Sequence, residues 1–336
     1  MRITYIFRTQ SRQRSIERVF TPIINKMIED GNDVEVEYTQ PFKNLLSTLL
    51  HNMWYFFKIS KRRICHITGD VQYLACVMNS DNTIMTIHDV VPLRNESVPW
   101  YSKLLCYLLW YYIPLKRLKV VTCISEATRS DILSFFPWAK DKLVVIPNPI
   151  DPSYQYIPKE FNSDCPRILH VGTKPNKNLL RVIEAVKDIK CHLRIIGKIP
   201  DLEIEQLNRY NVEYSNDVYV SDEQMLQEYI DCDIVSFPSL FEGFGMPIIE
   251  GQAVGRIVLS SNIEPMKSVS NGASCLIDPN SSESIRKGFL KVINDELYRD
   301  RQILHARLNS ERYSIHHIGS LYQNTYQELL DYNKLC

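Results

Sequence analysis

Residues 233–254 read DIVSFPSLFEGFGMPIIEGQAV and contain the most informative pattern in the chain. The apolar run from Asp233 to Phe237 predicts a buried strand, which Pro238-Ser239 brings to an end. The apolar stretch Ile248–Val254 predicts a helix with Pro247 in its early turn, where the first backbone amides have no intrahelical partner to lose. The sequence therefore predicts a buried strand, a short glycine-bearing loop and a helix.

The loop and helix start favour a ligand that combines anionic and hydroxylated groups. Gly243 and Gly245 allow the backbone to approach a ligand closely, and a helix start offers free amides to an anion. Glu242 on the loop and Glu250 inside the first turn would repel a phosphate but accept hydrogen bonds from hydroxyl groups. A nucleotide-sugar has this chemistry. The alternative is that Glu242 caps a loop and Glu250 is an acid favoured by a helix start.

Short β-rich runs alternate with helical patterns on both sides of this stretch. The alternation predicts parallel sheets with crossover helices, the doubly wound α/β class. One series of strands is expected at 2–7, 34–38, 64–67, 83–87, 120–124 and 143–146, and a second at 168–171, 193–196, 218–220, 233–237, 257–259 and 275–277. The proline-rich segment 147–166 separates them. We expect domains at 1–150 and 151–313, with a terminal helix in 314–336 that packs back on the first.

Bulk properties exclude several classes of protein. The length of 336 residues suits two domains, and 39 basic against 39 acidic residues give no net charge that would favour nucleic acid. Nine scattered cysteines without metal-type spacing indicate reduced core residues in a cytosolic protein. The N-terminus lacks the apolar core of a signal peptide, and no stretch reaches the roughly 18 apolar residues of a spanning helix. We expect a cytoplasmic location.

The stretch EGFGMPIIE, preceded by Pro238-Ser239, resembles the signature of family 4 of the retaining glycosyltransferases, two glutamates separated by seven residues. The resemblance implies the GT-B fold, in which two Rossmann-like domains face each other across a cleft. It also implies a metal-independent hexosyltransferase without a cofactor that uses a nucleotide-diphosphate sugar. Glu242 and the backbone of Phe244 and Gly245 would hold the sugar hydroxyls, and Glu250 would hold the ribose.

The same resemblance extends to residues 168–220. Strand 168–171 ends in Gly172-Thr173, and Lys177 falls on the family's lysine, a mobile charge suited to a diphosphate. The family's usual preceding arginine is Asn176 here, so Lys174 is a candidate substitute. The strand ends near Gly197 and Asp217 would flank the base. The implied donor-binding residues are Gly172, Thr173, Lys177, Asn178, Gly197, Ser239, Gly243, Phe244, Gly245, Met246 and Glu250, the implied catalytic residues are Glu242, His88 and Lys177, and no metal ligand is expected.

The first half of the chain carries weaker signals. His88-Asp89 ends the run TIMTIHD at the carboxyl edge of the expected sheet, where ligands bind in open α/β folds. This half resembles family members that act on bacterial surface polysaccharides, which places His88 near the transferred sugar and favours GDP-mannose over a UDP-hexose. The implied acceptor is a saccharide or a lipid-linked saccharide in surface polysaccharide or lipopolysaccharide synthesis. The alternative for His88 is a strand-end histidine with a turn-forming aspartate. His66 is expected to pack or to bind a neighbouring backbone group.

Three further segments have two interpretations each. The glycine-free loop after the first strand carries Arg8, Arg12 and Arg14, which either meet an anion or are solvated. Residues 45–63 and 104–119 join aromatic and aliphatic side chains to a basic end. Each predicts either an anionic membrane contact at the inner face of the cytoplasmic membrane or a core helix with a solvated basic end.

Two other functions are compatible with the fold. A nucleotide-sugar epimerase or a phosphorylase would share the architecture, and a non-catalytic sugar-binding assembly partner would keep it without activity. Asp231-Cys232-Asp233 fits an Asp-x-Asp metal motif, but its place between a helix and a buried strand predicts an ordinary boundary role.

Overall fold

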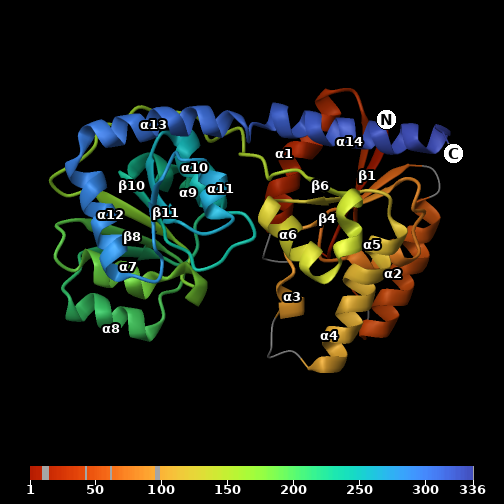
Figure 1. The fold of residues 1–336 in the computed structure, drawn as a ribbon, viewed down its shortest axis with the longest axis horizontal. Coiled ribbons are helices and arrows are strands. Elements are labelled where there is room, and N and C mark those ends of the chain that lie inside the picture. The colour runs from red at the N-terminus through yellow and green to blue at the C-terminus, as the bar shows by residue number, and fades with distance from the viewer. Residues whose placement is uncertain (10–14, 42–43, 61–62, 95–98, 336) are drawn as a thin grey trace. The chain divides into compact units, whose positions relative to one another are not determined.

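The protein folds into two α/β units, one formed by Met1–Pro149 together with Ile315–Cys336 and the other by Ile150–Ser314 (Figure 1). The structure is a computed structural model, and it describes residues 1–9, 15–41, 44–60, 63–94 and 99–335. Each unit contains one parallel sheet, as the alternation of strands and helices predicts.

The sheet of the first unit has the strand order β2-β1-β3-β4-β5-β6 within the described residues. Its strands are β1 (Arg2–Phe7), β2 (Asp33–Tyr38), β3 (Ile64–Ile67), β4 (Thr83–Ile87), β5 (Val121–Cys123) and β6 (Leu143–Val145). Its helices are α1 (Ser15–Glu29), α2 (Leu45–Ile59), η1 (Gln72–Cys76), α3 (Val91–Arg94), α4 (Trp100–Cys106), η2 (Tyr107–Tyr112), α5 (Ile113–Arg117), α6 (Glu126–Phe135), η3 (Pro137–Lys142) and the terminal α14 (Ile315–Leu335).

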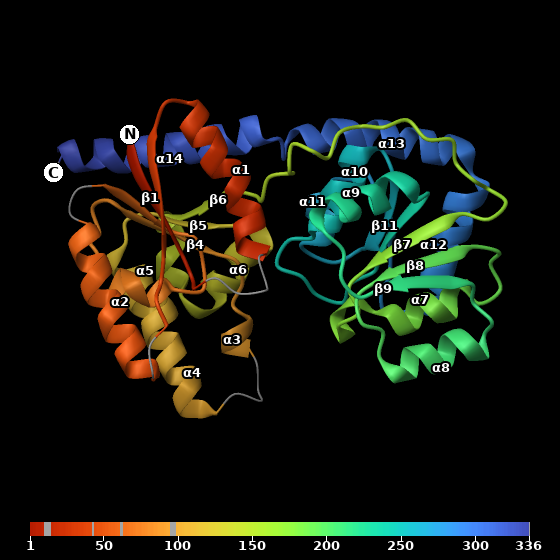
Figure 2. The ribbon, with the colours of Figure 1, turned by 180° about the vertical axis from the view of Figure 1, so that it is seen from behind.

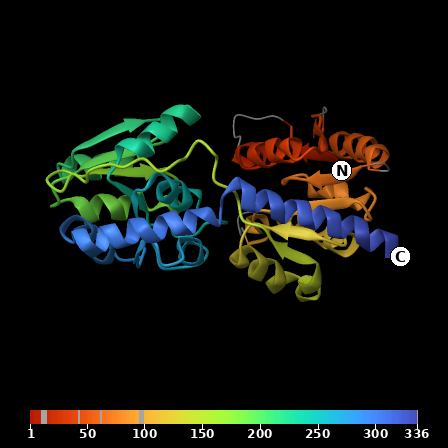
Figure 3. The ribbon, with the colours of Figure 1, turned by 90° about the horizontal axis from the view of Figure 1, so that it is seen from above.

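Helix α14 completes the first unit from the far end of the sequence. It packs against α1 over one face of the sheet, as the view from above shows (Figure 3). The contact is close, since a Cβ atom on Gly319 would lie 2.8 Å from Lys26 Cγ. Helices α2, α5 and α6 and the short segments η1 and η2 supply the core on the opposite face.

A buried polar network ties α14 to the strands. His66 Nδ1 lies 2.7 Å from the Tyr326 hydroxyl, and His66 Nε2 lies 2.7 Å from Thr86 Oγ1. The Tyr326 hydroxyl also donates to the Tyr5 hydroxyl at 3.0 Å. Burial lowers the pKa of His66 to about 3, so the ring is neutral at pH 7. His66 therefore packs in the core as expected, but its partners are side-chain hydroxyls rather than backbone groups.

The sheet of the second unit, all of whose residues are described, has the strand order β12-β11-β10-β7-β8-β9. Its strands are β7 (Arg167–Val171), β8 (His192–Ile196), β9 (Tyr214–Asp217), β10 (Ile234–Phe237), β11 (Ile257–Ser261) and β12 (Cys275–Ile277). Its helices are η4 (Pro175–Lys177), α7 (Leu179–Val186), α8 (Asp201–Arg209), α9 (Asp222–Asp231), α10 (Met246–Val254), α11 (Met266–Ser270), α12 (Ser282–Asn294) and α13 (Glu296–Glu311).

The chain order creates a switch point in this second sheet. From β7 the chain proceeds outward through β8 and β9, then returns to place β10 on the other side of β7 and continues to β11 and β12. Helices α7, α8 and α12 pack together on one face, and α9, α10 and α11 pack on the other (Figure 2). Ligands of open α/β sheets bind at such a switch point, beyond the carboxyl ends of the strands.

Two local expectations from the sequence are wrong. Residues 218–220 do not form a strand, because β9 occupies Tyr214–Asp217 and the β-prone side chains that follow it lie in an exposed loop, with Tyr219 90% exposed. The helical pattern after Asn178 also predicts that Leu180 points inward, but Val182 occupies the buried face of α7 and Leu180 is exposed. In both cases residue type was a poor guide to burial near the end of an element.

Two further properties of the described residues concern their cysteines and their helices. Eight cysteines are free and most of them are buried among apolar side chains. None of the described helices combines the length and apolar character needed to cross a bilayer.

Candidate active site

The loop between β10 and α10 lies at the switch point of the second sheet. Gly245 is the residue that caps α10, with a φ of +115°, a backbone conformation that glycine adopts without strain. A Cβ atom there would lie 3.1 Å from Ile248 Cδ1, so any side chain would also force Ile248 to shift. Met246 and Pro247 form the first turn, and the backbone amides at this helix start are suited to an anion.

Lys177 and Glu242 meet at this loop. Lys177 Nζ lies 2.6 Å from Glu242 Oε1, and their side chains are 19% and 16% exposed. Lys177 Nζ also lies 4.7 Å from the centroid of the Phe237 ring. Lys177 comes from η4 after β7 and Glu242 from the loop after β10, so the adjacency of those two strands brings them together.

Asn176, which replaces the family's usual arginine, takes part in the same cluster. Its Nδ2 donates to Glu242 Oε1 and to the Phe241 carbonyl, each at 3.2 Å. The Leu240 amide donates to the Asn176 carbonyl at 2.8 Å. Lys174 is exposed at the start of η4. The η4 turn thus holds the glutamate loop through both its backbone and its side chains.

Gly172 and Gly197 make room at the ends of β7 and β8. Both have positive φ, +89° and +129°. A Cβ on Gly172 would lie 3.1 Å from Lys177 Cγ, and one on Gly197 would lie 3.1 Å from Thr173 Oγ1. Thr173 Oγ1 donates to the Lys198 carbonyl at 2.6 Å and joins the two strand ends. Gly172 therefore accommodates the stem of Lys177.

Asn178 and Ser239 lie behind the loop. Asn178 Nδ2 donates to the carbonyls of Pro238 at 3.0 Å and Pro279 at 2.7 Å, which fixes the end of β10. The Ser239 carbonyl accepts from Ser261 Oγ at 2.6 Å. Ser239 Oγ is buried without a hydrogen-bond partner in the part of the protein that the structure describes. An unpaired buried hydroxyl is costly unless water or a ligand completes its hydrogen bonds.

Glu250 and Phe244 approach the site from α10 and the loop. Glu250 is the fifth residue of α10 and lies in the second turn of the helix. The sequence pattern predicts it in the first turn, so this detail is wrong. Its Oε2 accepts a hydrogen bond of 2.7 Å from the buried Tyr229 hydroxyl of α9. Burial, and then the Glu250 charge, raise the pKa of Tyr229 far above its usual value, so this hydroxyl stays a donor. The Phe244 ring packs edge-on against Tyr313, with the ring centroids 5.7 Å apart.

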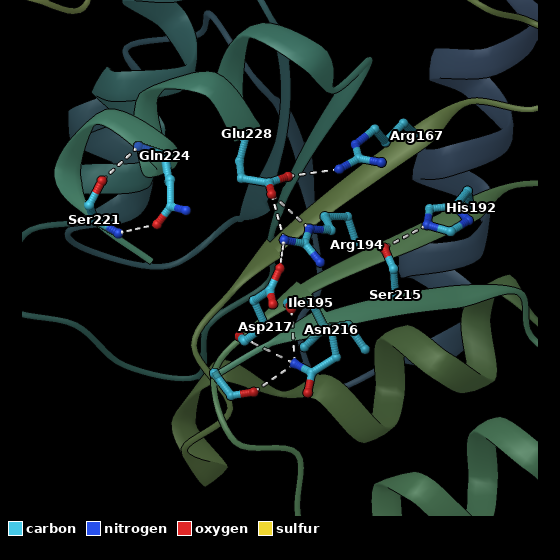
Figure 4. Close-up of polar contacts among 11 residues, drawn as sticks. Arg167, His192, Arg194, Ile195, Ser215, Asn216, Asp217, Ser221, Gln224 and Glu228 are labelled. Carbon is cyan, nitrogen blue, oxygen red and sulfur yellow. Dashed lines mark hydrogen bonds and ion pairs between the residues drawn. The ribbon is translucent and has the colours of Figure 1, made fainter. Parts of the chain in front are cut away.

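A charged network supports the ends of β8 and β9, and nothing in the sequence analysis anticipated it (Figure 4). Arg194 Nε donates to Glu228 Oε1 at 2.9 Å, and Arg167 donates to Glu228 Oε2 at 2.8 Å. Burial opposes ionisation of Glu228, but the hydrogen bonds from the two arginines hold its pKa below the usual value. Asn216 Nδ2 donates to the Gly197 carbonyl at 2.8 Å. An arginine inside the apolar run HLRII was the available signal, because a buried charge requires partners.

His88 belongs to the first unit and follows β4, as predicted. Its Nε2 lies 2.7 Å from the Thr68 carbonyl, which only accepts, so Nε2 carries the proton and Nδ1 is an acceptor in the neutral ring. Burial lowers the pKa of His88, although the hydrogen bond to the Thr68 carbonyl and the negative charges of Asp70 and Asp89 act to raise it. Arg8 forms an ion pair of 2.6 Å with Asp70. Arg12 and Arg14 lie outside the described residues.

The described residues contain no group of three or more His, Cys, Asp or Glu side chains placed to hold a metal ion. Asp233 of the Asp-x-Asp pattern is buried, pairs with Lys159 and accepts from the Arg167 amide at 2.8 Å. Asp231 accepts from Gln227 Nε2 at 2.7 Å. Both aspartates lie at the boundary between α9 and β10 and are held there by these contacts.

Comparisons with known proteins address the same two units. The family model described as "Glycosyl transferases group 1" matches residues 157–309, and the model described as "Glycosyltransferase Family 4" matches residues 38–154. Together they cover most of the chain.

Two proteins from Escherichia coli are similar in sequence to this chain. The serotype-specific mannosyltransferase WbdA is 22% identical over 260 residues, which are 69% of this chain and 32% of that protein. O-antigen chain mannosyltransferase B is 24% identical over 240 residues, 64% of this chain and 62% of that protein. The aligned region is thus about a third of the length of WbdA.

Solved structures share the architecture over nearly the whole chain. A glycosyltransferase from Rickettsia africae has a TM-score of 0.78 at 19% identity, with 98% of each chain covered. The Anabaena protein HepE in complex with UDP and glucose has a TM-score of 0.74 at 15% identity, with 97% of this chain and 99% of that chain covered. The chain belongs to family 4 of the glycosyltransferases and has the GT-B fold, with two Rossmann-like units.

Proposed function

We propose that the protein transfers a hexosyl group from a nucleotide-diphosphate sugar to a saccharide or a lipid-linked saccharide in surface polysaccharide or lipopolysaccharide synthesis. The observation that carries the proposal is the Lys177–Glu242 pair beside the start of α10, at the switch point of the second sheet. A cation and a helix start suit the diphosphate, and a carboxylate suits the hydroxyl groups of the sugar.

Each side chain has a role in the proposed reaction. The diphosphate attracts Lys177 away from Glu242, and Lys177 with the amides near Gly245 stabilises the charge that develops as the diphosphate departs. Glu242, released from the lysine, accepts hydrogen bonds from the sugar. Glu250, held by Tyr229, binds the ribose hydroxyls. His88 of the first unit is proposed as a further catalytic residue.

The proposed chemistry retains the anomeric configuration and uses neither a metal nor a cofactor. The bond from the anomeric carbon to the diphosphate breaks, and a bond to the acceptor oxygen forms on the same face. The acceptor's proton leaves with the phosphate. Lys177 and the helix start supply the positive charge that a metal provides in other transferases. Determination of the anomeric configuration of the product by NMR tests retention, and an inverted product would contradict it.

The proposed donor is GDP-mannose, because two of the relatives in sequence are mannosyltransferases. A UDP-hexose is the competing donor, since HepE was solved with UDP and glucose. The proposed place of action is the cytoplasm, where nucleotide-sugars are made, at the inner face of the cytoplasmic membrane.

A thermal-shift panel of UDP- and GDP-sugars and the free diphosphates, with and without EDTA, tests the donor site. A ligand that binds the native state raises the unfolding midpoint with its concentration and affinity. We expect a shift for one nucleotide that persists in EDTA. Loss of the shift in EDTA would contradict metal independence, and no shift with any nucleotide would favour a non-catalytic assembly partner. Product analysis without an acceptor separates transfer from epimerisation.

A further inference from the structure

Helix α2 exposes an apolar stripe that its place in the fold does not require. Leu46, Leu50, Trp54 and Phe57 follow one another at intervals of four, four and three residues and so share one side of the helix. Leu46 is 67% exposed and Trp54 is 59% exposed. The same helix buries Leu49 and Phe56 in the core, so its packing needs are already met.

Helix α4 and the start of η2 present a second stripe. Its members are Trp100, Tyr101, Leu104, Leu105 and Leu108, which again share one side of the chain's helical path and are all exposed. Trp100 is 76% exposed, and α4 has no buried residue. A helix whose large apolar side chains face solvent over two turns is typical of an interaction surface.

The two stripes belong to one region of the first unit. Helix α2 and segment η2 both pack against η1, and the Tyr73 ring of η1 lies 5.1 Å from the Trp110 ring of η2. In Figures 1 and 2, α2 and α4 run along the part of the unit opposite to α14. We call the nine side chains of the two stripes the apolar surface.

The two segments that carry the apolar surface have basic but no acidic side chains of their own. Residues 45–60 and 99–119 contain no aspartate or glutamate, whereas Lys58, Lys103 and Lys116 lie within them. Lys58 Nζ lies 3.5 Å from the centroid of the Trp54 ring. Lys116 Nζ lies 4.0 Å from the centroid of the Trp138 ring. Aromatic rings beside lysines combine an apolar body with a cationic edge.

We propose that the apolar surface docks on a lipid bilayer with anionic headgroups. Tryptophan and tyrosine side chains settle at headgroup depth, leucines enter the acyl boundary, and the lysines meet lipid phosphates. A second copy of the chain is a poorer occupant, because a symmetric contact would bring the same lysines together and the two segments contribute no carboxylate to offset them. The docking goes beyond the donor chemistry and does not depend on it.

Flotation with vesicles tests this surface. The full chain is mixed with phosphatidylcholine vesicles, with or without phosphatidylglycerol, and centrifuged through a density gradient. We expect the protein to float with the anionic vesicles. The variants L50S/W54S and W100S/L104S are each expected to lower the partition coefficient by at least about tenfold, since each removes two side chains that would enter the interface.

A matched control removes exposed leucines elsewhere. The variant L297S/L304S changes two side chains of α13 that are 77% and 58% exposed in the second unit, and we expect it to float like the unchanged protein. The variant K58E/K103E keeps the aromatic rings and is expected to weaken flotation with anionic vesicles only, in a salt-dependent way. Unaltered nucleotide-induced thermal shifts in all variants would show that the fold and donor site are intact.

Several results would overturn the proposal. The proposal would be wrong if the protein stayed at the bottom of the gradient with anionic vesicles. It would also be wrong if the control and the stripe variants lost flotation equally. Equal flotation with vesicles of phosphatidylcholine alone would show that binding does not require anionic headgroups. A concentration-dependent dimer in analytical ultracentrifugation that the stripe variants abolish, without flotation, would assign the surface to a second copy of the chain.

Discussion

Lys177 Nζ and Glu242 Oε1 lie 2.6 Å apart, although the two residues are 65 positions apart in the sequence. Both side chains are mostly buried, and Asn176 donates a further hydrogen bond to the same carboxylate oxygen. The two groups proposed to handle the diphosphate and the sugar therefore neutralise each other here. A donor must replace this ion pair, and its phosphates are the stronger partner for the ammonium.

Loss of the Lys177 charge is expected to weaken donor binding and slow turnover. Lys177→Gln removes the cation at the diphosphate, and we expect turnover to fall by about 10²–10³-fold, the range for loss of one group that stabilises developing charge. Steady-state kinetics with the preferred donor measures this fall in turnover. Lys174→Gln, at an exposed position on the same turn, is the matched control and is expected to have a small effect. A large effect at Lys174 with none at Lys177 would exchange the two roles.

Substitutions of Glu242 and Glu250 are expected to affect different steps of the reaction. Glu242→Ala should lower turnover far more than donor affinity, because the carboxylate contacts the sugar that reacts. Glu250→Ala should mainly weaken donor binding, because the ribose takes no part in the reaction and contributes uniform binding. Calorimetry gives the affinities and initial rates give turnover. Equal losses of donor affinity, with turnover unchanged in both variants, would count against these roles.

Gly172→Ala is expected to disturb Lys177, whereas Gly31→Ala is not. Both glycines have positive φ, +89° and +79°, so alanine introduces similar backbone strain at each, of order 1 kcal/mol. A Cβ on Gly172 would crowd Lys177 Cγ at 3.1 Å, while one on Gly31 would meet nothing within 4 Å.

Both variants should lose comparable stability in chemical unfolding, and Gly172→Ala alone should also lose donor affinity. Unchanged donor affinity in Gly172→Ala would show that the position of the Lys177 stem does not matter for binding.

Acid is expected to destabilise the first unit through His66. Burial lowers the pKa of His66 to about 3, below its ordinary value of 6.5. Between these values the unfolded chain binds a proton that the folded chain does not, so stability falls as the pH falls from about 6.5 towards 3. The unfolding midpoint measured across this range should decline less in His66→Asn than in the unchanged protein.

The exposed His316 provides the control for this pH dependence. His316→Gln should leave the slope of midpoint against pH unchanged, since the side chain of His316 is exposed and is not part of the buried network around His66. A slope that His66→Asn does not alter would assign the acid sensitivity to another buried group, such as His170, whose pKa burial also lowers to about 3.

Local sequence determined the type of fold and the composition of the loop. The alternation of β-prone runs with amphipathic helices predicted the doubly wound class, because side-chain periodicity reports which face of an element is buried. The loop from Glu242 to Met246 was predicted as a glycine-bearing helix start, because turn chemistry depends on adjacent residues. Element ends were less predictable, as the exposed Tyr219 and Leu180 illustrate.

Tertiary structure alone decided which distant groups meet. The placement of β10 beside β7 brings Glu242 to Lys177, the packing of α9 on α10 supplies Tyr229 to Glu250, and α14 returns Tyr326 to within 3.0 Å of Tyr5. It also decided that α2 turns an apolar stripe to solvent, since two apolar sides of one helix look alike in sequence. Strand order and helix docking arise from contacts between segments far apart in the chain, and these leave no pattern in a local window of sequence.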